Sequence, residues 1–280
     1  MMRPILDLGT LALDLSKPAV VGIVNVTPDS FSDGGKNYEA AVAIENGLRM
    51  AADGAAVIDV GGESTRPGAA PVPVAEERRR VLPVVKALAE RTGAIVSVDT
   101  RKAAVAEAAI GAGARIVNDV SGLRFDPHMA GVVAKAGAGL VLMHMRGTPQ
   151  DMQQRCRYRN VAREVCDELR ESLRIALDAG VREDRIVVDP GFGFAKTLEQ
   201  NFELLRRLSE LQCLGRPIMA GTSRKSMIRR TLGDDPHALL IGTVATCVMA
   251  LQGGARLLRV HAVREIVLVA RMWEAVGGQT

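Results

Sequence analysis

A buried strand runs into a long polar loop in the stretch Gly22-Ile23-Val24-Asn25-Val26-Thr27-Pro28-Asp29-Ser30-Phe31-Ser32-Asp33-Gly34-Gly35. The apolar, β-branched run Ala19–Val24 predicts a strand buried on both faces, as in a parallel sheet. Helical spacing of apolar residues resumes only near Tyr38. A polar loop of this length in an α/β chain is typical of a lid or binding loop, and a turn with a helix cap is the alternative.

The same alternation of a short apolar run and a helical pattern recurs along the chain. The expected strands are 20–24, 56–60, 94–98, 115–117, 139–143, 185–188, 217–220 and 257–260. Helical patterns follow them near 38–53, 74–91, 103–112, 127–136, up to 179, 198–211, 224–251 and 265–276. A small hairpin over 5–15 is expected before the first strand.

Apolar strands that alternate with helices favour parallel strands covered by helices. Eight such units in 280 residues predict an α/β fold of the (β/α)8 TIM barrel type, with the whole chain, 1–280, as one domain. A doubly wound sheet is the alternative, but no Gly-x-Gly-x-x-Gly motif follows the first strand. No linker or charge run divides the chain.

The composition argues against several classes of protein. Aromatic residues make up only 3%, which disfavours base stacking, and a net charge of +4 supplies no basic arm, so we expect no nucleic-acid partner. Zinc-site spacing is absent from the four cysteines, which we expect to be buried free thiols: Cys156, Cys166, Cys213 and Cys247.

The apolar segments do not suggest a membrane protein. The longest weakly polar run, 239–251, is too short to span a bilayer. Asp7 and Asp14 interrupt the apolar residues near the start, so we expect no signal peptide. The sequence therefore predicts a cytoplasmic protein without a membrane partner.

Polar residues follow the predicted strands, and in a barrel these strand ends share one face. They are Asn25, the loop 61–68, Asp99, Asn118, Asp119, His144, Asp189, the run 223–226, Arg259 and His261. Each alone has a structural explanation, such as a helix cap for Asp99 or a turn at Asp189-Pro190-Gly191. Their occurrence after all eight strands favours a binding site.

The chemistry of these groups suggests two kinds of ligand. The carboxylates of Asp99 and Asp189, with the Asn118 amide and in one interpretation Asp119, can pair with a flat heterocycle rich in N–H groups. Cationic side chains can hold a phosphate: Arg66, Lys225, Arg259 and His261. Asn25 can offer an oxygen to Mg²⁺, and Ser226 at a helix start can bind a second anion.

At these positions the chain resembles the dihydropteroate synthase family. The segments 25–35 and 61–68 look like its two signature loops. Further matches follow in order at 97–100, 118–122, 143–149, 189–194, 223–226 and 259–261, so the resemblance covers essentially the whole chain.

The resemblance implies a barrel enzyme, commonly a homodimer, that acts as an alkyl transferase. It joins 6-hydroxymethyl-7,8-dihydropterin pyrophosphate to p-aminobenzoate, for which sulfonamides compete, and releases 7,8-dihydropteroate and pyrophosphate. The implied pterin contacts are Asp99, Asn118, Met143, Asp189, Gly221 and Lys225. The implied pyrophosphate contacts are Asn25, Thr65, Arg66, Arg259 and His261, with Mg²⁺ at Asn25. The implied p-aminobenzoate contacts are Phe31, Thr65, Pro67, Phe194 and Ser226. The implied catalytic residues are Asp99, Asp189, Lys225 and Arg259.

Two residues depart from the family pattern. Ala262 stands where the family usually has Asp, and Met227 stands where it usually has Phe.

A corrinoid methyltransferase that binds a folate is the alternative with the same fold, and a non-catalytic pterin-binding homologue is the alternative from another class. Both signature loops are expected to order around the bound pyrophosphate.

Overall fold

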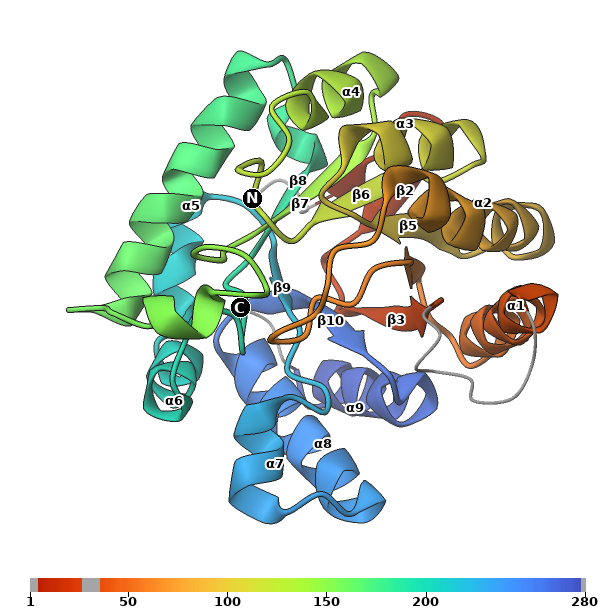
Figure 1. Cartoon of the computed structure of the whole chain (residues 1–280). Coiled ribbons are helices and arrows are strands. Elements are labelled where there is room, and N and C mark those ends of the chain that lie inside the picture. Colours follow the sequence, from red (N-terminus) through yellow and green to blue (C-terminus); the bar gives the residue numbers. More distant parts are fainter. Residues whose placement is uncertain (1–4, 27–35, 278–280) are drawn as a thin grey trace.

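Eight parallel strands form a closed barrel surrounded by helices (Figure 1). The computed structural model describes residues 5–26 and 36–277. The strand order around the barrel is β10-β3-β4-β5-β6-β7-β8-β9, which confirms the predicted TIM barrel. The strands are β3 (Ala19–Asn25), β4 (Val57–Gly61), β5 (Ile95–Asp99), β6 (Ile116–Asp119), β7 (Gly139–Met143), β8 (Ile186–Asp189), β9 (Ile218–Ala220) and β10 (Ala255–Val260).

The helices follow the strands in the predicted alternation. The α-helices are α1 (Lys36–Ala52), α2 (Val74–Arg91), α3 (Ala103–Gly111), α4 (Met129–Ala136), α5 (Val161–Asp178), α6 (Leu198–Arg206), α7 (Ser226–Leu232), α8 (Pro236–Gln252) and α9 (Val263–Ala275). The 3₁₀ helices are η2 (Met152–Arg155), η3 (Glu183–Arg185) and η4 (Leu208–Leu214). None of the helices in 5–26 and 36–277 is long and apolar enough to cross a membrane.

The helical segments predicted between 224 and 251 are the two helices α7 and α8. Gly233 ends α7 with a φ of 92°, a conformation that favours glycine. Asp235 then caps α8 by accepting hydrogen bonds from the backbone N–H groups of His237 and Ala238. The helix predicted over 198–211 is shorter than predicted. The α-helix α6 ends at Arg206, and the 3₁₀ helix η4 follows it.

The predicted hairpin consists of β1 (Ile5–Asp7) and β2 (Ala12–Asp14), which pair antiparallel. Leu6, Leu8 and Leu15 are buried against the first inward-facing residues of the barrel strands, such as Val57. A Cβ at Gly139 would lie 2.6 Å from Leu8 Cδ2, so glycine leaves room for this contact. The hairpin therefore closes the N-terminal end of the barrel.

The barrel interior changes from apolar to polar along its axis. Side chains alternate along a strand, so residues two apart face the same side. In β4 the apolar Val57 is followed on its face by Asp59, and in β10 Leu257 is followed by Arg259. Since parallel strands point the same way, these charged residues meet near the C-terminal end, opposite the hairpin.

Candidate active site

An arginine and two carboxylates meet inside the barrel. Arg259 Nε lies 2.7 Å from Asp59 Oδ2, and Arg259 Nη2 lies 2.6 Å from Asp99 Oδ2. Asn118 Nδ2 donates to the same Asp59 oxygen at 2.9 Å. Since these side chains come from β4, β5, β6 and β10, their contacts cross the interior.

A second acid and base lie on the opposite wall. Asp189 ends β8, and its Oδ1 accepts the Gly191 N–H at 2.7 Å. Lys225, at the start of α7, is close enough to Asp189 to lower the pKa of that carboxyl, although burial raises it overall. Burial lowers the pKa of Lys225 to about 8, against the attraction of Asp189. A Cβ on Gly221 would lie 3.9 Å from Asp189 Oδ2 and 3.8 Å from Arg259 Cβ, so this glycine lies between the two pairs.

The cluster is acidic and incompletely hydrogen bonded. When ionised, the carboxylates of Asp59, Asp99 and Asp189 outnumber the cations of Lys225 and Arg259 by one. Burial raises the pKa of Asp99 to about 7, and Arg259 opposes the rise while Asp59 adds to it. Two buried oxygens, Asp59 Oδ1 and Asn118 Oδ1, find no hydrogen-bond donor among the residues that the structure describes. Buried acceptors of this kind are costly unless a ligand pairs with them.

A positively charged region lies beside the acidic cluster. His261, just past β10, is held by Ser223 Oγ at 3.1 Å from its Nδ1. Burial, followed by the charges of Arg224, Arg259 and Arg66, lowers its pKa to about 3. The loops after β4 and β9 and the strand β10 thus bring cationic groups near His261.

The second signature loop, 61–68, is held in place by contacts of Glu63 with Lys102, Arg101 and Val72. Glu63 accepts from Lys102 Nζ at 2.5 Å and from the Val72 N–H at 2.7 Å, and it pairs with Arg101 at 2.9 Å. The Gly68 N–H donates to Pro149 O at 2.8 Å. Thr65 is half-buried in this loop, whereas Arg66 and Pro67 are exposed.

The remaining predicted residues lie around the rim. Asn25 is exposed at the end of β3, and Ser226 is exposed at the first position of α7. Met143 is buried at the end of β7 in a cluster with the half-buried Phe194. Phe31 and the first signature loop from Thr27 to Gly35 lie outside the described residues.

Asp59 was missed by the sequence reasoning, although it contacts both Arg259 and Asn118. A carboxylate within the apolar run Val57–Gly61 is the signal that could have found it. Asp119, considered for the heterocycle, instead stabilises a turn. Its oxygens accept from the Ser121 N–H, the Ser121 hydroxyl and the Leu123 N–H.

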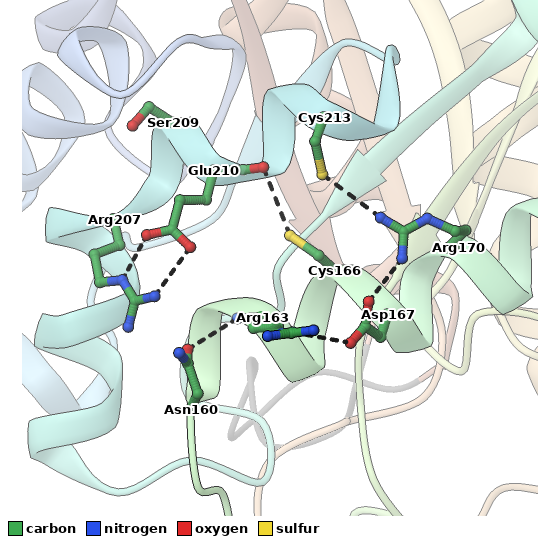
Figure 2. A pocket seen from close by; sticks show the side chains of 9 residues that line it. All are labelled: Asn160, Arg163, Cys166, Asp167, Arg170, Arg207, Ser209, Glu210 and Cys213. Atoms are coloured by element: carbon green, nitrogen blue, oxygen red, sulfur yellow. Dashed lines mark hydrogen bonds and ion pairs between the residues drawn. The ribbon is translucent and has the colours of Figure 1, made fainter.

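A groove elsewhere on the molecule lacks comparable chemistry. It lies between α5 and η4, and Figure 2 shows the side chains that line it. Its arginines are neutralised by neighbouring acids, such as Arg170 by Asp167 at 2.7 Å and Arg207 by Glu210 at 2.6 Å. Cys166 and Cys213 in this groove are free thiols, as predicted, and so are Cys156 and Cys247. The predicted burial is correct for Cys166 and Cys247 but wrong for Cys213, which is exposed, and Cys156 is only half-buried. None of these residues comes from a strand end.

Comparison with known proteins identifies the family. A family model described as "Pterin binding enzyme" matches residues 21–261. Dihydropteroate synthase of Escherichia coli is 45% identical over 264 residues, which cover 94% of this chain and 93% of that protein. The chain belongs to the dihydropteroate synthase family. It is therefore a transferase, and the two alternatives considered from the sequence, a corrinoid methyltransferase and a non-catalytic homologue, are not favoured.

Solved structures of dihydropteroate synthases share the fold over almost the full chain. The enzyme of Xanthomonas albilineans, solved with 4-aminobenzoic acid, has a TM-score of 0.92 and 45% identity and covers 99% of both chains. The enzyme of Yersinia pestis, solved with a sulfonamide drug complex, has a TM-score of 0.91 and 43% identity and covers 98% of this chain and 99% of that one.

Proposed function

We propose that the acidic cluster inside the barrel binds the pterin ring of 6-hydroxymethyl-7,8-dihydropterin pyrophosphate. The observation that carries this proposal is the pair of buried acceptors without donors, Asp59 Oδ1 and Asn118 Oδ1. A pterin edge presents N–H groups that can donate to such oxygens. The proposed contacts are Asp59, Asp99, Asn118, Met143, Asp189, Gly221 and Lys225.

The pyrophosphate lies, in this proposal, across the neighbouring cationic region. Arg259 binds Asp99 in the acidic cluster and is close enough to His261 for its charge to lower the pKa of that histidine, so in this proposal it contacts both parts of the substrate. The proposed pyrophosphate contacts are Asn25, Thr65, Arg66, Arg259 and His261. His261 is uncharged in the free protein because its pKa is near 3, and a bound anion would raise that pKa.

The site also suits a magnesium ion. Asn25 is exposed at the end of β3, beside Gly61 in the strand register, and it offers an amide oxygen. Mg²⁺ prefers oxygen ligands and keeps most of its coordination for water and phosphate, so one protein oxygen is an adequate donor set. Asn25 would hold the ion, which would neutralise charge on the leaving pyrophosphate. Titration of Asn25→Ala with Mg²⁺ and pyrophosphate in a calorimeter tests this, and unchanged binding would contradict it.

The amine substrate, p-aminobenzoate, binds in this proposal beside the loop after β8. Phe194 lies there with Lys225 Nζ 4.3 Å from its ring centroid. The proposed contacts are Phe31, Thr65, Pro67, Phe194 and Ser226. The related enzymes bound to 4-aminobenzoic acid and to a sulfonamide support this proposal, and sulfonamides are expected to compete here.

The geometry favours ionisation before amine attack. Departure of pyrophosphate leaves positive charge on the pterin methylene, which spreads into the ring. Asp59, Asp99 and Asp189 surround the ring position and can stabilise this charge electrostatically. The aniline nitrogen then forms the C–N bond and loses a proton. This sequence needs no covalent enzyme intermediate.

The outer surface suggests how two copies associate. Exposed apolar side chains lie at helical spacing on α9, namely Leu268 and Met272, and Val276 directly after the helix continues the spacing. The neighbouring α8 adds Ile241 and Met249. Exposed apolar patches of this kind mark interaction sites, so we propose a homodimer through α8 and α9. Met272→Glu should then shift the sedimentation coefficient to that of a monomer, and an unchanged value would exclude this face.

The function is tested by turnover. The purified protein should convert the pterin pyrophosphate and p-aminobenzoate into dihydropteroate, detected by mass spectrometry. Asp59→Asn keeps the shape but replaces the unpaired acceptor, and it should lose most pterin binding. Wild-type binding by Asp59→Asn would remove the observation on which the proposal rests.

A further inference from the structure

A buried lysine supports the loop after β8 from outside the pterin site. Lys196 is only 3% exposed. Its ammonium nitrogen lies 3.0 Å from each of three acceptors: Gly191 O, Phe194 O and His144 Nδ1. All three of its hydrogens are therefore used, and none of these acceptors is a carboxylate.

Burial lowers the pKa of Lys196 to about 7, and the carboxylates of Asp189 and Glu168 oppose this shift. His144 Nε2 lies 3.1 Å from Glu168 Oε2 on α5, and Arg146 and Arg124 also contact this glutamate. Burial, followed by the charge of Lys196, lowers the pKa of His144 to about 3, so the ring is neutral. Because Nδ1 accepts from Lys196, Nε2 carries the hydrogen and donates to Glu168. The imidazole thus links the buried cation to an acid.

The loop that Lys196 contacts has three residues with positive φ, a backbone conformation that is unfavourable for most residues. Gly191 and Gly193 have φ values of 68° and 81°, and Ala195 has a φ of 48° although it carries a Cβ. A Cβ on Gly191 would lie 2.0 Å from His144 O, so no other residue fits there. A non-glycine residue in this region typically costs about 1 kcal/mol, so the conformation needs contacts that hold it.

The opposite side of the same loop faces the active site. Lys225 Nζ donates to Phe192 O and lies against the Phe194 ring. The Gly191 N–H donates to Asp189 Oδ1. The loop is therefore held between a lysine of the site and a lysine behind it. Asn201 adds one more contact by accepting the Gly193 N–H at 2.6 Å.

We propose that Lys196, together with His144, is a positioning residue for the p-aminobenzoate side of the site. It holds the Gly191–Phe194 turn so that the Phe194 ring stays against Lys225. On the pterin side, Asp189 is fixed by its place at the end of β8, and the turn reaches it only through the Gly191 N–H, so this side is affected less. The inference rests on the proposed function, in which Phe194 lines the p-aminobenzoate pocket.

The test compares Lys196→Met with Lys135→Met, an exposed lysine on α4. Lys196→Met should raise the KM for p-aminobenzoate about tenfold and the KM for the pterin substrate by a smaller factor, because the turn also contacts Asp189 and Lys225. Hydrogen exchange of the amides in 191–194 should become faster in this variant without either substrate. The control should match the wild type in all three measurements.

A second pair of variants distinguishes positioning from loss of packing. His144→Gln retains an acceptor for Lys196 and a donor for Glu168, whereas His144→Leu retains neither. His144→Leu should reproduce the Lys196→Met pattern, and His144→Gln should show a smaller change. Wild-type exchange rates in Lys196→Met, or an equal rise in both KM values, would overturn the proposal. If the wild type forms no dihydropteroate, the proposed function fails, and the exchange rates still decide whether Lys196 positions the loop.

Discussion

Arg259 is the residue around which the acidic cluster is arranged. Its guanidinium binds Asp59 through one nitrogen and Asp99 through another, which a single ammonium point charge would not do with the same geometry. Burial alone would lower the pKa of Arg259, but these two carboxylates raise it above the ordinary value and keep the guanidinium charged. A substitution here would leave two buried carboxylates without their cation.

Asp189→Asn tests the second acid at the residue scale. The neutral amide removes a charged acceptor for pterin N–H groups, so pterin affinity should fall by about 2–4 kcal/mol with the fold intact. Calorimetry with a pterin analogue measures this loss. Asp184→Asn on the exposed η3 provides the control and should bind normally. Normal affinity in Asp189→Asn would mean that Asp189 serves only its turn with Gly191.

Asp99 predicts an acid limb in the pH profile. Its pKa is raised to about 7 by burial, and only its ionised form stabilises the cationic pterin, so kcat/KM should fall below about pH 7. Asp99→Asn should be slow and should lose this limb. A limb that stays at the same pH in the variant would belong to another group, such as the substrate phosphate.

The raised pKa of Asp99 also makes the free energy of unfolding depend on pH. The folded pKa of Asp99 lies above its ordinary value of 3.8, so the folded state binds more protons between these two values. The contribution of Asp99 to stability is therefore fully present in acid and is lost as the pH rises towards 7.

At the scale of elements, α9 begins without a cap. Ala262 occupies the N-cap position and makes no side-chain hydrogen bond to the first turn. The Asp usual in the family at this position could accept from the free backbone N–H groups there. The departure at Ala262 thus bears on the start of a helix, next to His261. Met227, the other departure, is buried in the core on α7.

Ala262→Asp should therefore stabilise the protein. A new N-cap is typically worth about 1 kcal/mol, and activity should stay the same or rise slightly. Urea unfolding gives the change in free energy, and Ala262→Asn serves as a cap without charge. A collapse of activity in Ala262→Asp would show that the end of β10 has packed around alanine.

At the scale of the molecule, one end of the barrel is closed by apolar packing and the other end holds the charged cluster. The hairpin β1–β2 places Leu6, Leu8 and Leu15 in the N-terminal end, which is apolar. The charged cluster lies at the other end. This separation means that the stability of the closed end can change without a change in the chemistry.

Leu6→Ala tests this separation. Removing a fully buried leucine side chain typically costs about 2–5 kcal/mol, so the midpoint of urea unfolding should fall. The KM values of both substrates should remain those of the wild type at temperatures where the protein is folded. Ile5→Ala on the same strand is the control, because Ile5 is 46% exposed and should cost little. Altered KM values in Leu6→Ala would mean that the hairpin is coupled to the site.

The sequence alone determined the barrel and most of the candidate site. Apolar runs such as Gly139–Met143 are readable because strands buried on both faces lack polar residues. Asp99, Asn118 and Asp189 were predicted to lie together because they end consecutive or nearby runs, and parallel strands bring those ends to one face. The family motifs added the roles, which remain proposals for the individual residues.

Tertiary structure alone decided which polar groups pair and which are left for a ligand. Asp59 and Arg259 are 200 positions apart, and only closure of β10 against β3 brings them to 2.7 Å. Asp119 looks like its neighbour Asn118 in the sequence, yet its oxygens are taken by its own turn. Alternation along a strand is local and can be read from one chain segment. Pairing across the barrel depends on register and closure, which are set by contacts among all eight strands.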